Sequence, residues 1–474
     1  MRSEKMHTTP GRQLLRKSVK AQKLGHTVAL LLWAFACKMT GECKSDEDCP
    51  TPQTFCHFAE NAKQGDKGLC VFTHSIHGFN PLEAARGATL LIQGSDFFAE
   101  PSKNIVTLNG VPAEVLAASS SELQVKVPQN LRCSGPVQVT IGERVATTTK
   151  AFTYVPTVTV STLAGSTAGP ANGTGTAAQF QNPTGIAIDA AGNLYVTDKG
   201  NHHIRKVTPE GVVSTLAGNA LFDEGTGSLA SFNAPDGVAI DTAGNLYVAD
   251  KENHRIRKVT PEGVVSTLAG STKGFVDDTG GAARFSQPVG IAIDAAGNLY
   301  VTEWGHRIRK VTPEGVVSTL AGSTLGSMDG VGTSAQFNTP SGVAIDTAGN
   351  LYVADYGNHR IRKVTPEGVV STFAGRNTDG FADGSAENAR FNAPLGIAAD
   401  ADGYFYVADT YNHRIRRISP EGAVRTLAGS TPGFADGIGS AAQFQYPVGI
   451  TTDASGILYV ADQSNHRIRK LLLE

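Results

Sequence analysis

Short runs of alternating apolar and polar residues, each closed by a turn, fill most of this chain. Along its last two-thirds the runs come in groups of four, joined by Ala-Gly-Asn and Pro-Glu-Gly tripeptides that are typical of turns. One such group covers residues 237–241, 245–250, 254–260 and 263–270. Alternation with a period of two indicates half-buried β-strands, so the pattern predicts an all-β fold.

These groups of four runs repeat along the chain. Each opens with Pro-x-Gly, and the openings recur at intervals of 52 to 54 residues. They begin at Pro183, Pro235, Pro288, Pro340, Pro394 and Pro447. Four short antiparallel strands in a unit of this length are typical of one propeller blade. Residues 157–474 are therefore predicted to form a six-bladed β-propeller.

One outer strand is out of place in the repeat, and its position predicts how the ring closes. The sequence (Ser/Arg)-Thr-(Leu/Phe)-Ala-Gly occurs six times, but the last group lacks it and stops at Glu474. The missing copy precedes the first group, at Val158–Gly165. We expect this N-terminal strand to complete the last blade, which leaves no free strand edge.

The repeated segments (Leu/Phe)-Tyr-Val-Ala-Asp and Asn-His-Arg-Ile, the latter at residues 253–256 for example, resemble those of the NHL repeat family. The resemblance covers residues 157–474 and implies a six-bladed propeller of the NHL type. Propellers of this family bind proteins, bind RNA or, less often, catalyse reactions. The resemblance therefore predicts the fold and leaves the function open.

Residues 75–156 carry a second set of alternating runs, each ending in Gly or Pro, which predicts a small β-sandwich. Their landmarks are residues 87–97, Asn109-Gly110, Pro128 and the closing Ala151-Phe-Thr-Tyr154. In this order they resemble the IPT/TIG family of immunoglobulin-like domains. The resemblance implies a spacer or interaction module of an extracellular protein.

The N-terminus has the parts of an export signal. Seven basic residues precede the apolar run Val28–Ala36, which at nine residues is too short to span a bilayer. Residues 34–36 fit an Ala-x-Ala cleavage site, so residues 1–36 are predicted to be a signal peptide. Cys37 follows directly and is a candidate for lipidation, although Phe35 departs from a lipobox. We expect an exported protein that is secreted, periplasmic or a cell-envelope lipoprotein. The sequence leaves the lipid anchor open, and no other form of membrane attachment is predicted.

Residues 37–74 are predicted to be a Cys-rich linker. Its cysteines Cys43, Cys49, Cys56 and Cys70 lack the close pairing of a zinc site, and an exported chain favours two disulfides among them. The spacing leaves all three pairings open. Cys133 is left over, either free or paired with Cys37 if Cys37 is not lipidated.

The charge balance argues against nucleic acid as a partner. From Thr157 onward there are 24 Lys and Arg against 30 Asp and Glu, a net charge of −6. Nucleic-acid binders normally show a basic balance over the binding domain. The repeated Arg-x-Arg-Lys strand places Arg255 and Arg257 on one side and Lys258 on the other. We interpret these bases as blade-to-blade salt bridges or solvated faces.

The repeated histidines and loop acids could suggest metal sites. One histidine per blade stands at positions 202, 254, 306, 359, 413 and 466, but neighbours on such a ring should lie about 10 Å apart, too far to share zinc. We expect a repeated hydrogen-bond network of Asp, Asn, His and Arg instead. The loop acids Asp277, Asp329, Asp383 and Asp436 could bind Ca²⁺, although Asx-type turns explain them better. No metal or other cofactor is predicted.

Comparison of the six copies locates a candidate binding patch. Antiparallel blades place the loop between the second and third strands, and the crossing to the next blade, on one face of the ring. The two positions before Asn-His on this face differ from copy to copy. Exposed Trp and Tyr residues at these positions could anchor a partner, or the positions could vary because nothing constrains them. The predicted binding residues are Trp304, Tyr356, Tyr411, Lys199, Lys251 and Asp236.

Two functions from different classes follow. The favoured one is an exported binding or scaffold protein that uses this face to recognise a protein or glycan partner. The alternative is a metal-dependent lyase or lactonase with its site at the propeller channel. Catalysis needs a solitary acid, base or nucleophile, and the near-identical inner strands supply none, so no catalytic residue is predicted.

Overall fold

The computed structural model describes residues 42–43, 54–57, 68–72, 74–131, 134–218 and 224–474. The chain divides into two compact units, Met1–Val155 and Pro156–Glu474. Both are built from strands and short 3₁₀ turns. Within the part of the chain that the structure describes, there is no helix with the length and hydropathy of a membrane span.

Three short strands lie in the Cys-rich segment. They are β1 (Glu42–Cys43), β2 (Thr54–His57) and β3 (Gly68–Phe72), in the order β1-β3-β2. The register of β2 and β3 sets Cys56 opposite Cys70. The disulfides themselves stay a prediction. The signal segment 1–36, Cys37, Cys49 and Cys133 lie outside the described residues.

Residues 75–154 form the immunoglobulin-like sandwich that the alternation predicts. Its strands are hydrogen-bonded in the order β4-β6-β9-β8-β7-β10-β11-β5. They are β4 (Ser75–Asn80), β5 (Glu83–Ala84), β6 (Thr89–Ser95), β7 (Ile105–Leu108), β8 (Val111–Ala118), β9 (Glu122–Lys126), β10 (Gly135–Ile141) and β11 (Arg144–Tyr154), with a 3₁₀ turn, η2 (Pro101–Lys103), before β7.

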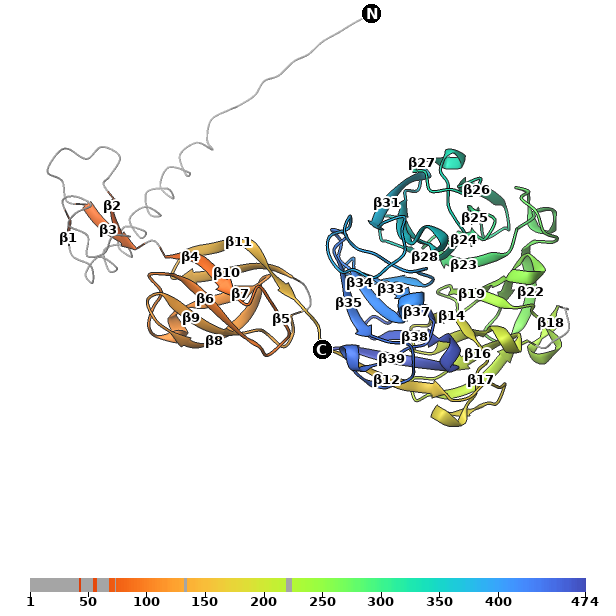
Figure 1. The fold of residues 1–474 in the computed structure, drawn as a ribbon, viewed down its shortest axis with the longest axis horizontal. Helices are drawn as coiled ribbons and strands as arrows, with labels where there is room; N and C mark the ends of the chain where they lie inside the picture. The colour runs from red at the N-terminus through yellow and green to blue at the C-terminus, as the bar shows by residue number, and fades with distance from the viewer. Residues whose placement is uncertain (1–41, 44–53, 58–67, 73, 132–133, 219–223) are drawn as a thin grey trace, which may run out of the picture. The chain divides into compact units, whose positions relative to one another are not determined.

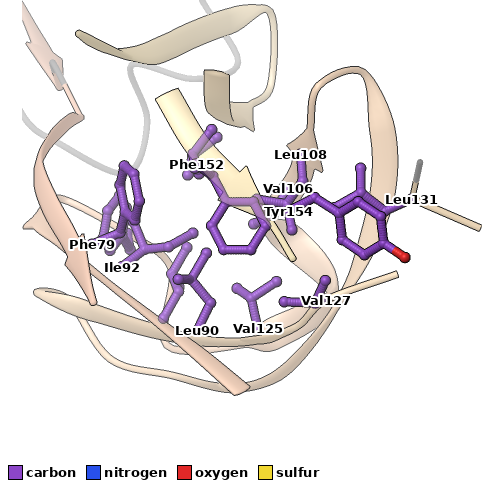
Figure 2. Close-up of a cluster of buried hydrophobic side chains, with 14 residues drawn as sticks. Phe79, Leu90, Ile92, Val106, Leu108, Val125, Val127, Leu131, Phe152 and Tyr154 are labelled. Carbon is purple, nitrogen blue, oxygen red and sulfur yellow. The ribbon is translucent and has the colours of Figure 1, made fainter. Parts of the chain in front are cut away.

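Alternate residues of these strands point inward and form one apolar core. Figure 2 shows Phe152 of β11 reaching into the cluster toward the side chains of β6 and β9. Leu90, Ile92 and Val125 are fully buried there, whereas their chain neighbours face outward. Burying each side chain of this size contributes about 1.5–3 kcal/mol to the stability of the folded domain.

Pro156–Glu474 forms the six-bladed propeller, with the inner strands around the centre and the outer strands at the rim (Figure 1). Blades 1 to 3 consist of β14 (Pro183–Ile188), β15 (Leu194–Asp198), β16 (His203–Val207), β17 (Val212–Ala217); β19 (Pro235–Ile240), β20 (Leu246–Asp250), β21 (Arg255–Val259), β22 (Val264–Gly270); and β23 (Pro288–Ile293), β24 (Leu299–Glu303), β25 (Arg307–Val311), β26 (Val317–Ala321).

Blades 4 to 6 follow the same order from the inner to the outer strand. They consist of β28 (Pro340–Ile345), β29 (Leu351–Asp355), β30 (Arg360–Val364), β31 (Val369–Gly375); β32 (Ile397–Ala399), β33 (Phe405–Asp409), β34 (Arg414–Ile418), β35 (Val424–Gly429); and β37 (Pro447–Thr452), β38 (Leu458–Asp462), β39 (Arg467–Leu473), β12 (Val158–Gly165).

The ring closes where the sequence predicts. Strand β12 pairs antiparallel with β39, the last strand of the chain, and so supplies the outer strand of blade 6. The backbone groups of Thr157 and Glu474 exchange two hydrogen bonds of 2.8 Å at the end of this pair. Four two-residue strands cover the outer edges of blades 1, 2, 4 and 6, which protects those edges from pairing with another chain: β13 (Gly173–Thr174), β18 (Gly225–Thr226), β27 (Gly330–Val331) and β36 (Gly437–Ile438).

The glycine of each Pro-x-Gly motif lets adjacent blades approach closely. A Cβ atom on Gly185 would collide with the carbonyl oxygen of Asp236 in the next blade, and one on Gly449 would collide with that of Thr184 across the closure. The same contact recurs at the intervening glycines. The residue x of each motif is therefore fixed in a ring of six around the channel mouth.

Candidate binding site

One loop per blade begins at a buried acid at the end of the second strand. In five blades the loop is a single 3₁₀ turn: η4 (Lys199–Asn201), η6 (Lys251–Asn253), η9 (Tyr356–Asn358), η10 (Thr410–Asn412) and η12 (Gln463–Asn465). In each of these the following histidine takes the left-handed conformation, with φ between 56° and 58°. Because the acid also pairs with the proline of Pro-x-Gly, as Asp355 does with Pro340, this loop and the motif share one face.

The acid is the centre of a buried network. In blade 4, Asp355 Oδ1 accepts a hydrogen bond from the Asn338 backbone amide (2.8 Å), and Oδ2 accepts from Asn358 (2.8 Å) and Arg362 (2.9 Å). The predicted network is therefore confirmed for Asp, Asn and Arg. The interpretation of these arginines as blade-to-blade bridges or solvated bases is wrong for the second arginine of the motif. Its side chain is fully buried within its own blade in all six cases: Arg205, Arg257, Arg309, Arg362, Arg416 and Arg469.

The half-exposed loop acids bind the buried arginines of the same network. Asp329 accepts a hydrogen bond of 2.6 Å from Arg362 Nη2 and further bonds from Thr372. Asp277, Asp383 and Asp436 bind their blades' arginines in the same way. The prediction of local Asx turns at these four positions is wrong, because their carboxylates hold an arginine and a threonine distant in the sequence.

Each loop histidine reaches the next blade. Its Nδ1 accepts a hydrogen bond from the backbone amide that precedes the next Pro-x-Gly, as His359 does from Ala393 at 3.0 Å. His466 makes the same bond to Asn182 across the closure, at 3.3 Å. The histidines therefore join successive blades, outside the Asp-Asn-Arg network to which the sequence assigned them. Burial lowers the pKa of four of them, which favours the neutral, accepting form: His254, His306, His413 and His466.

Two rings of six positions form a pocket at the channel mouth. The floor is the residue x of each Pro-x-Gly motif: Thr184, Asp236, Val289, Ser341, Leu395 and Val448. The wall is the first residue after each buried acid: Lys199, Lys251, Trp304, Tyr356, Thr410 and Gln463. All of these line the pocket except Lys251, which lies behind Trp304 and Asp236. The cavity has a volume of about 180 Å³.

Aromatic side chains gather on the side of blades 3 to 6. The Tyr356 and Tyr411 ring centroids lie 6.3 Å apart with an interplanar angle of 65°, and those of Tyr411 and Tyr446 lie 5.3 Å apart. The Tyr356 hydroxyl donates a hydrogen bond of 3.5 Å to Tyr411, and burial with this bond raises the pKa of Tyr356 to about 12. Trp304 and Tyr411 are 38% and 48% exposed, so each offers ring surface to a ligand, although Lys251 Nζ occupies one face of the Trp304 ring.

Charged groups gather on the side of blades 1 and 2. Asp236 Oδ2 lies 2.9 Å from Lys199 Nζ and 3.7 Å from Lys251 Nζ, and Lys251 Nζ lies 3.2 Å from the centre of the Trp304 ring. Burial opposes the charge of Lys199, but Asp236 outweighs it and raises the pKa of Lys199. Burial lowers the pKa of the deeper Lys251, and its neighbour Lys199 lowers it further.

The structure thus brings all six predicted binding residues to one site. Five line the pocket, and Lys251 contacts two of the five. The sequence reasoning missed Tyr446, Thr410, Gln463 and the floor positions other than Asp236. A signal for the floor was present, since x varies within a Pro-x-Gly motif that is otherwise constant. Tyr446 stands where the other copies carry small or polar residues, so a comparison of that column would have found it too.

Blade 3 departs from the repeat beside the pocket. Its loop is one residue shorter, and Glu303 replaces the buried aspartate. Glu303 Oε1 accepts hydrogen bonds from the Ser286 amide (3.0 Å) and Arg309 (3.2 Å), whereas Oε2 is buried without a hydrogen-bond partner among the described residues. Burial raises the pKa of Glu303 to about 7, against the opposing effect of Arg309.

Glu303→Gln should therefore stabilise the propeller increasingly as the pH rises. The carboxyl of the folded protein keeps a proton that the unfolded chain, with a pKa near 4.5, has lost, so the wild type loses stability as the pH rises from about 4.5 through 7. We expect the difference in melting temperature between the Glu303→Gln variant and the wild-type protein to grow from pH 5 to pH 8. Glu314→Gln, at an exposed turn, should show no such slope. A pH-independent difference would contradict the buried titration.

The channel beneath the pocket offers a different environment. Its cavity of about 290 Å³ is lined by the inner strands, with Gly, Ala, Ile and Val and the threonines at 451 and 452. No lining residue carries a titratable side chain. In the described part of the chain, no three His, Cys, Asp or Glu side chains come together in a way that could hold a metal ion.

The fold and this site define a class: a six-bladed propeller, with an immunoglobulin-like domain before it in the sequence, that carries an asymmetric pocket on its loop face. Comparison with known families agrees. The NHL repeat profile matches residues 180–207, 232–259, 337–364, 391–418 and 444–471, and the IPT/TIG domain profile matches residues 75–155. The chain thus carries NHL repeats in its propeller and an IPT/TIG domain ahead of them in the sequence.

Curated relatives share the repeat region. The chain is 32% identical over 340 residues to NHL repeat-containing protein 2 of Bos taurus, covering 62% of this chain and 46% of that protein. It is 30% identical over 224 residues to human Teneurin-4, covering 40% of this chain and 8% of that protein. The chain thus spans about half or less of the length of these relatives.

Solved structures share the fold at low identity. A structural genomics protein of unknown function from Bacteroides thetaiotaomicron aligns with a TM-score of 0.57 at 21% identity, covering 85% of this chain and 98% of that one. An auxiliary nutrient binding protein from the same organism aligns with a TM-score of 0.54 at 20% identity, with the same coverage. At about 20% identity, these comparisons show a shared fold and nothing more.

Proposed function

We propose that this protein is an exported, non-catalytic binding protein that captures a small ligand, or a small group of a larger partner, in the pocket at the propeller mouth. The observation that carries the proposal is the broken symmetry of two six-membered rings. Four aromatic side chains from blades 3 to 6 face a Lys–Asp pair from blades 1 and 2, where a purely structural repeat would keep the positions alike. Concave sites of this kind, apolar with a few polar groups, are typical of ligand binding.

Two further facts support the proposal. The chain begins with a basic stretch and a short apolar run that fit an export signal, and the similar Bacteroides fold includes an auxiliary nutrient binding protein. The apolar lining of the channel favours binding over catalysis, because no titratable side chain there could serve as general acid or base.

Tryptophan fluorescence tests the proposal. The chain has two tryptophans, and Trp33 lies in the predicted signal peptide, so the emission change seen on binding should come from Trp304. We expect a ligand found by screening soluble metabolites and saccharides to shift this emission, and Trp304→Ala with Tyr356→Ala to abolish its binding by calorimetry. Phe434→Ala removes an equally exposed ring outside the pocket lining and should bind normally. Binding that survives the double change would place the site elsewhere.

A further inference from the structure

The charges at the pocket point to an uncharged ligand. Two lysines, Lys199 and Lys251, share the Asp236 carboxylate, and Glu252 adds a second negative charge that acts on both ammonium groups. Two positive and two negative groups leave no net charge. An anionic ligand would meet Asp236, and a cationic one would meet the lysines. A neutral ligand avoids both penalties, provided that it replaces the water that these groups lose.

The Lys199–Asp236 pair offers a donor and an acceptor side by side. Both lysines approach the same carboxylate oxygen, Oδ2, and the structure gives Oδ1 no hydrogen bond from the described residues. Lys199 Nζ makes one hydrogen bond to a carboxylate there and has three N–H groups. Adjacent hydroxyl groups match this arrangement, since one can donate to Oδ1 while its neighbour accepts from Nζ.

Across the pocket the same ligand would meet apolar ring surface. Trp304 and Tyr411 are both exposed, although Lys251 Nζ occupies one face of Trp304, and the nearly perpendicular Tyr411 and Tyr446 rings form a corner. The volume of about 180 Å³ corresponds to about six water molecules, the scale of one six-membered ring with its substituents. The ligand should therefore have one face of C–H groups and an edge of vicinal hydroxyls.

We propose that the pocket binds one pyranose ring of a neutral carbohydrate, with its C–H face on the aromatic side chains and two adjacent hydroxyls on Asp236 and Lys199. This inference rests on the proposed function and adds the ligand class to it. The rest of a longer glycan would extend out of the open pocket. A purely apolar ligand is disfavoured because it would bury Asp236 Oδ1 and the remaining N–H groups of Lys199 without hydrogen-bond partners.

The test titrates the full chain with two panels, read by Trp304 emission and calorimetry. One panel holds methyl glycosides of glucose, galactose, mannose and N-acetylglucosamine with their β1,4-linked disaccharides. The other holds amino acids, dicarboxylates and nucleosides. We expect saturable binding of at least one glycoside. Its deoxy analogue, lacking one of the adjacent hydroxyls, should bind at least tenfold more weakly, and the parent glycoside should bind Asp236→Asn at least tenfold more weakly. Phe434→Ala should leave the affinity unchanged.

The outcomes separate this inference from the proposed function. If a nucleoside or amino acid binds with loss in Trp304→Ala while no glycoside does, the carbohydrate inference fails and the proposed function stands. Glycoside binding that depends on Trp304 but ignores both the deoxy change and Asp236→Asn overturns the inference as well. Should neither panel bind, or should glycosides bind with no effect of Trp304→Ala, both proposals fail.

Discussion

Replacing Arg362 by leucine is expected to lower the free energy of unfolding of the propeller by about 3–5 kcal/mol. Arg362 is 0% exposed and binds the fully buried carboxylate of Asp355 at 2.9 Å and the half-exposed carboxylate of Asp329 at 2.6 Å. It also donates to the carbonyl oxygens of Gln336 and Met328, at 3.0 and 3.1 Å. Its loss leaves Asp355 buried without a counter-charge, where burial already raises its pKa.

Urea denaturation of the full chain, followed by tyrosine and tryptophan emission, measures this loss. Arg360→Leu is the matched control, since Arg360 lies two residues earlier on the same strand and is partly exposed. It donates one hydrogen bond to Ser327 O at 2.7 Å, so its loss should cost about 1 kcal/mol. Equal costs for the two arginines would contradict the assignment of Arg362 to the blade core.

A double variant separates the ion pair from packing. In Arg362→Met with Asp355→Asn, both buried charges disappear while the volumes stay close. We expect the double variant to be more stable than Arg362→Leu. Replacing both charged groups by uncharged ones costs less stability than leaving the Asp355 carboxylate buried without a counter-charge. Additive effects of the two single changes would show that the pair is not coupled.

The repeat made the fold predictable, because six copies of one pattern identify the four strands of a blade more firmly than any single copy. Counting the outer strands predicted that Val158–Gly165 closes the ring, and β12 pairs with β39 as expected. Both inferences depend on local pattern and order along the chain. The sandwich core of the IPT/TIG domain was accessible in the same way, from period-two alternation.

What the pattern could not provide was which face of a strand is buried. Alternation placed Arg255 and Arg257 on one side of their strand, but a blade is packed on both sides by its neighbours. In the structure Ile256 and Arg257 are both fully buried, and the register of β21 and β22 shifts between them. The extra residue of this bulge, Leu268, lies in β22, so Ile256 and Arg257 stay on opposite faces of β21, and both faces are buried there. Only the structure shows that the second arginine of the motif is buried because it pairs with an acid of its own blade, as Arg257 does with Asp250.

The histidines and the pocket show the same limit at longer range. The bond from His359 to Ala393 crosses from one blade to the next, and its existence depends on the angle between blades rather than on any local motif. Sequence comparison did identify Trp304 and Tyr356 as positions that vary. Their convergence with Asp236, from blades 3, 4 and 2, is a consequence of ring geometry.

A disulfide across the closure should stabilise the propeller far more than the same disulfide inside a blade. Ser161 of β12 stands opposite Lys470 of β39, and Ser214 of β17 stands opposite Lys206 of β16 at the equivalent place in blade 1. The two pairs share local geometry, but the first encloses about 310 residues and the second about nine. Chain-entropy estimates give roughly 5–6 kcal/mol for the first crosslink and roughly 2–3 kcal/mol for the second.

We expect Ser161→Cys with Lys470→Cys to exceed Lys206→Cys with Ser214→Cys by about 3 kcal/mol in the free energy of unfolding. Each oxidised variant is compared with its own reduced form and with wild type under the same conditions, which removes the contribution of the natural cysteines. The physical reason is that β12 is held to β39 by non-covalent bonds, whereas β16 and β17 are joined by a tight turn. Equal gains would contradict this account, in which the crosslink that encloses the longer loop restricts the unfolded chain more.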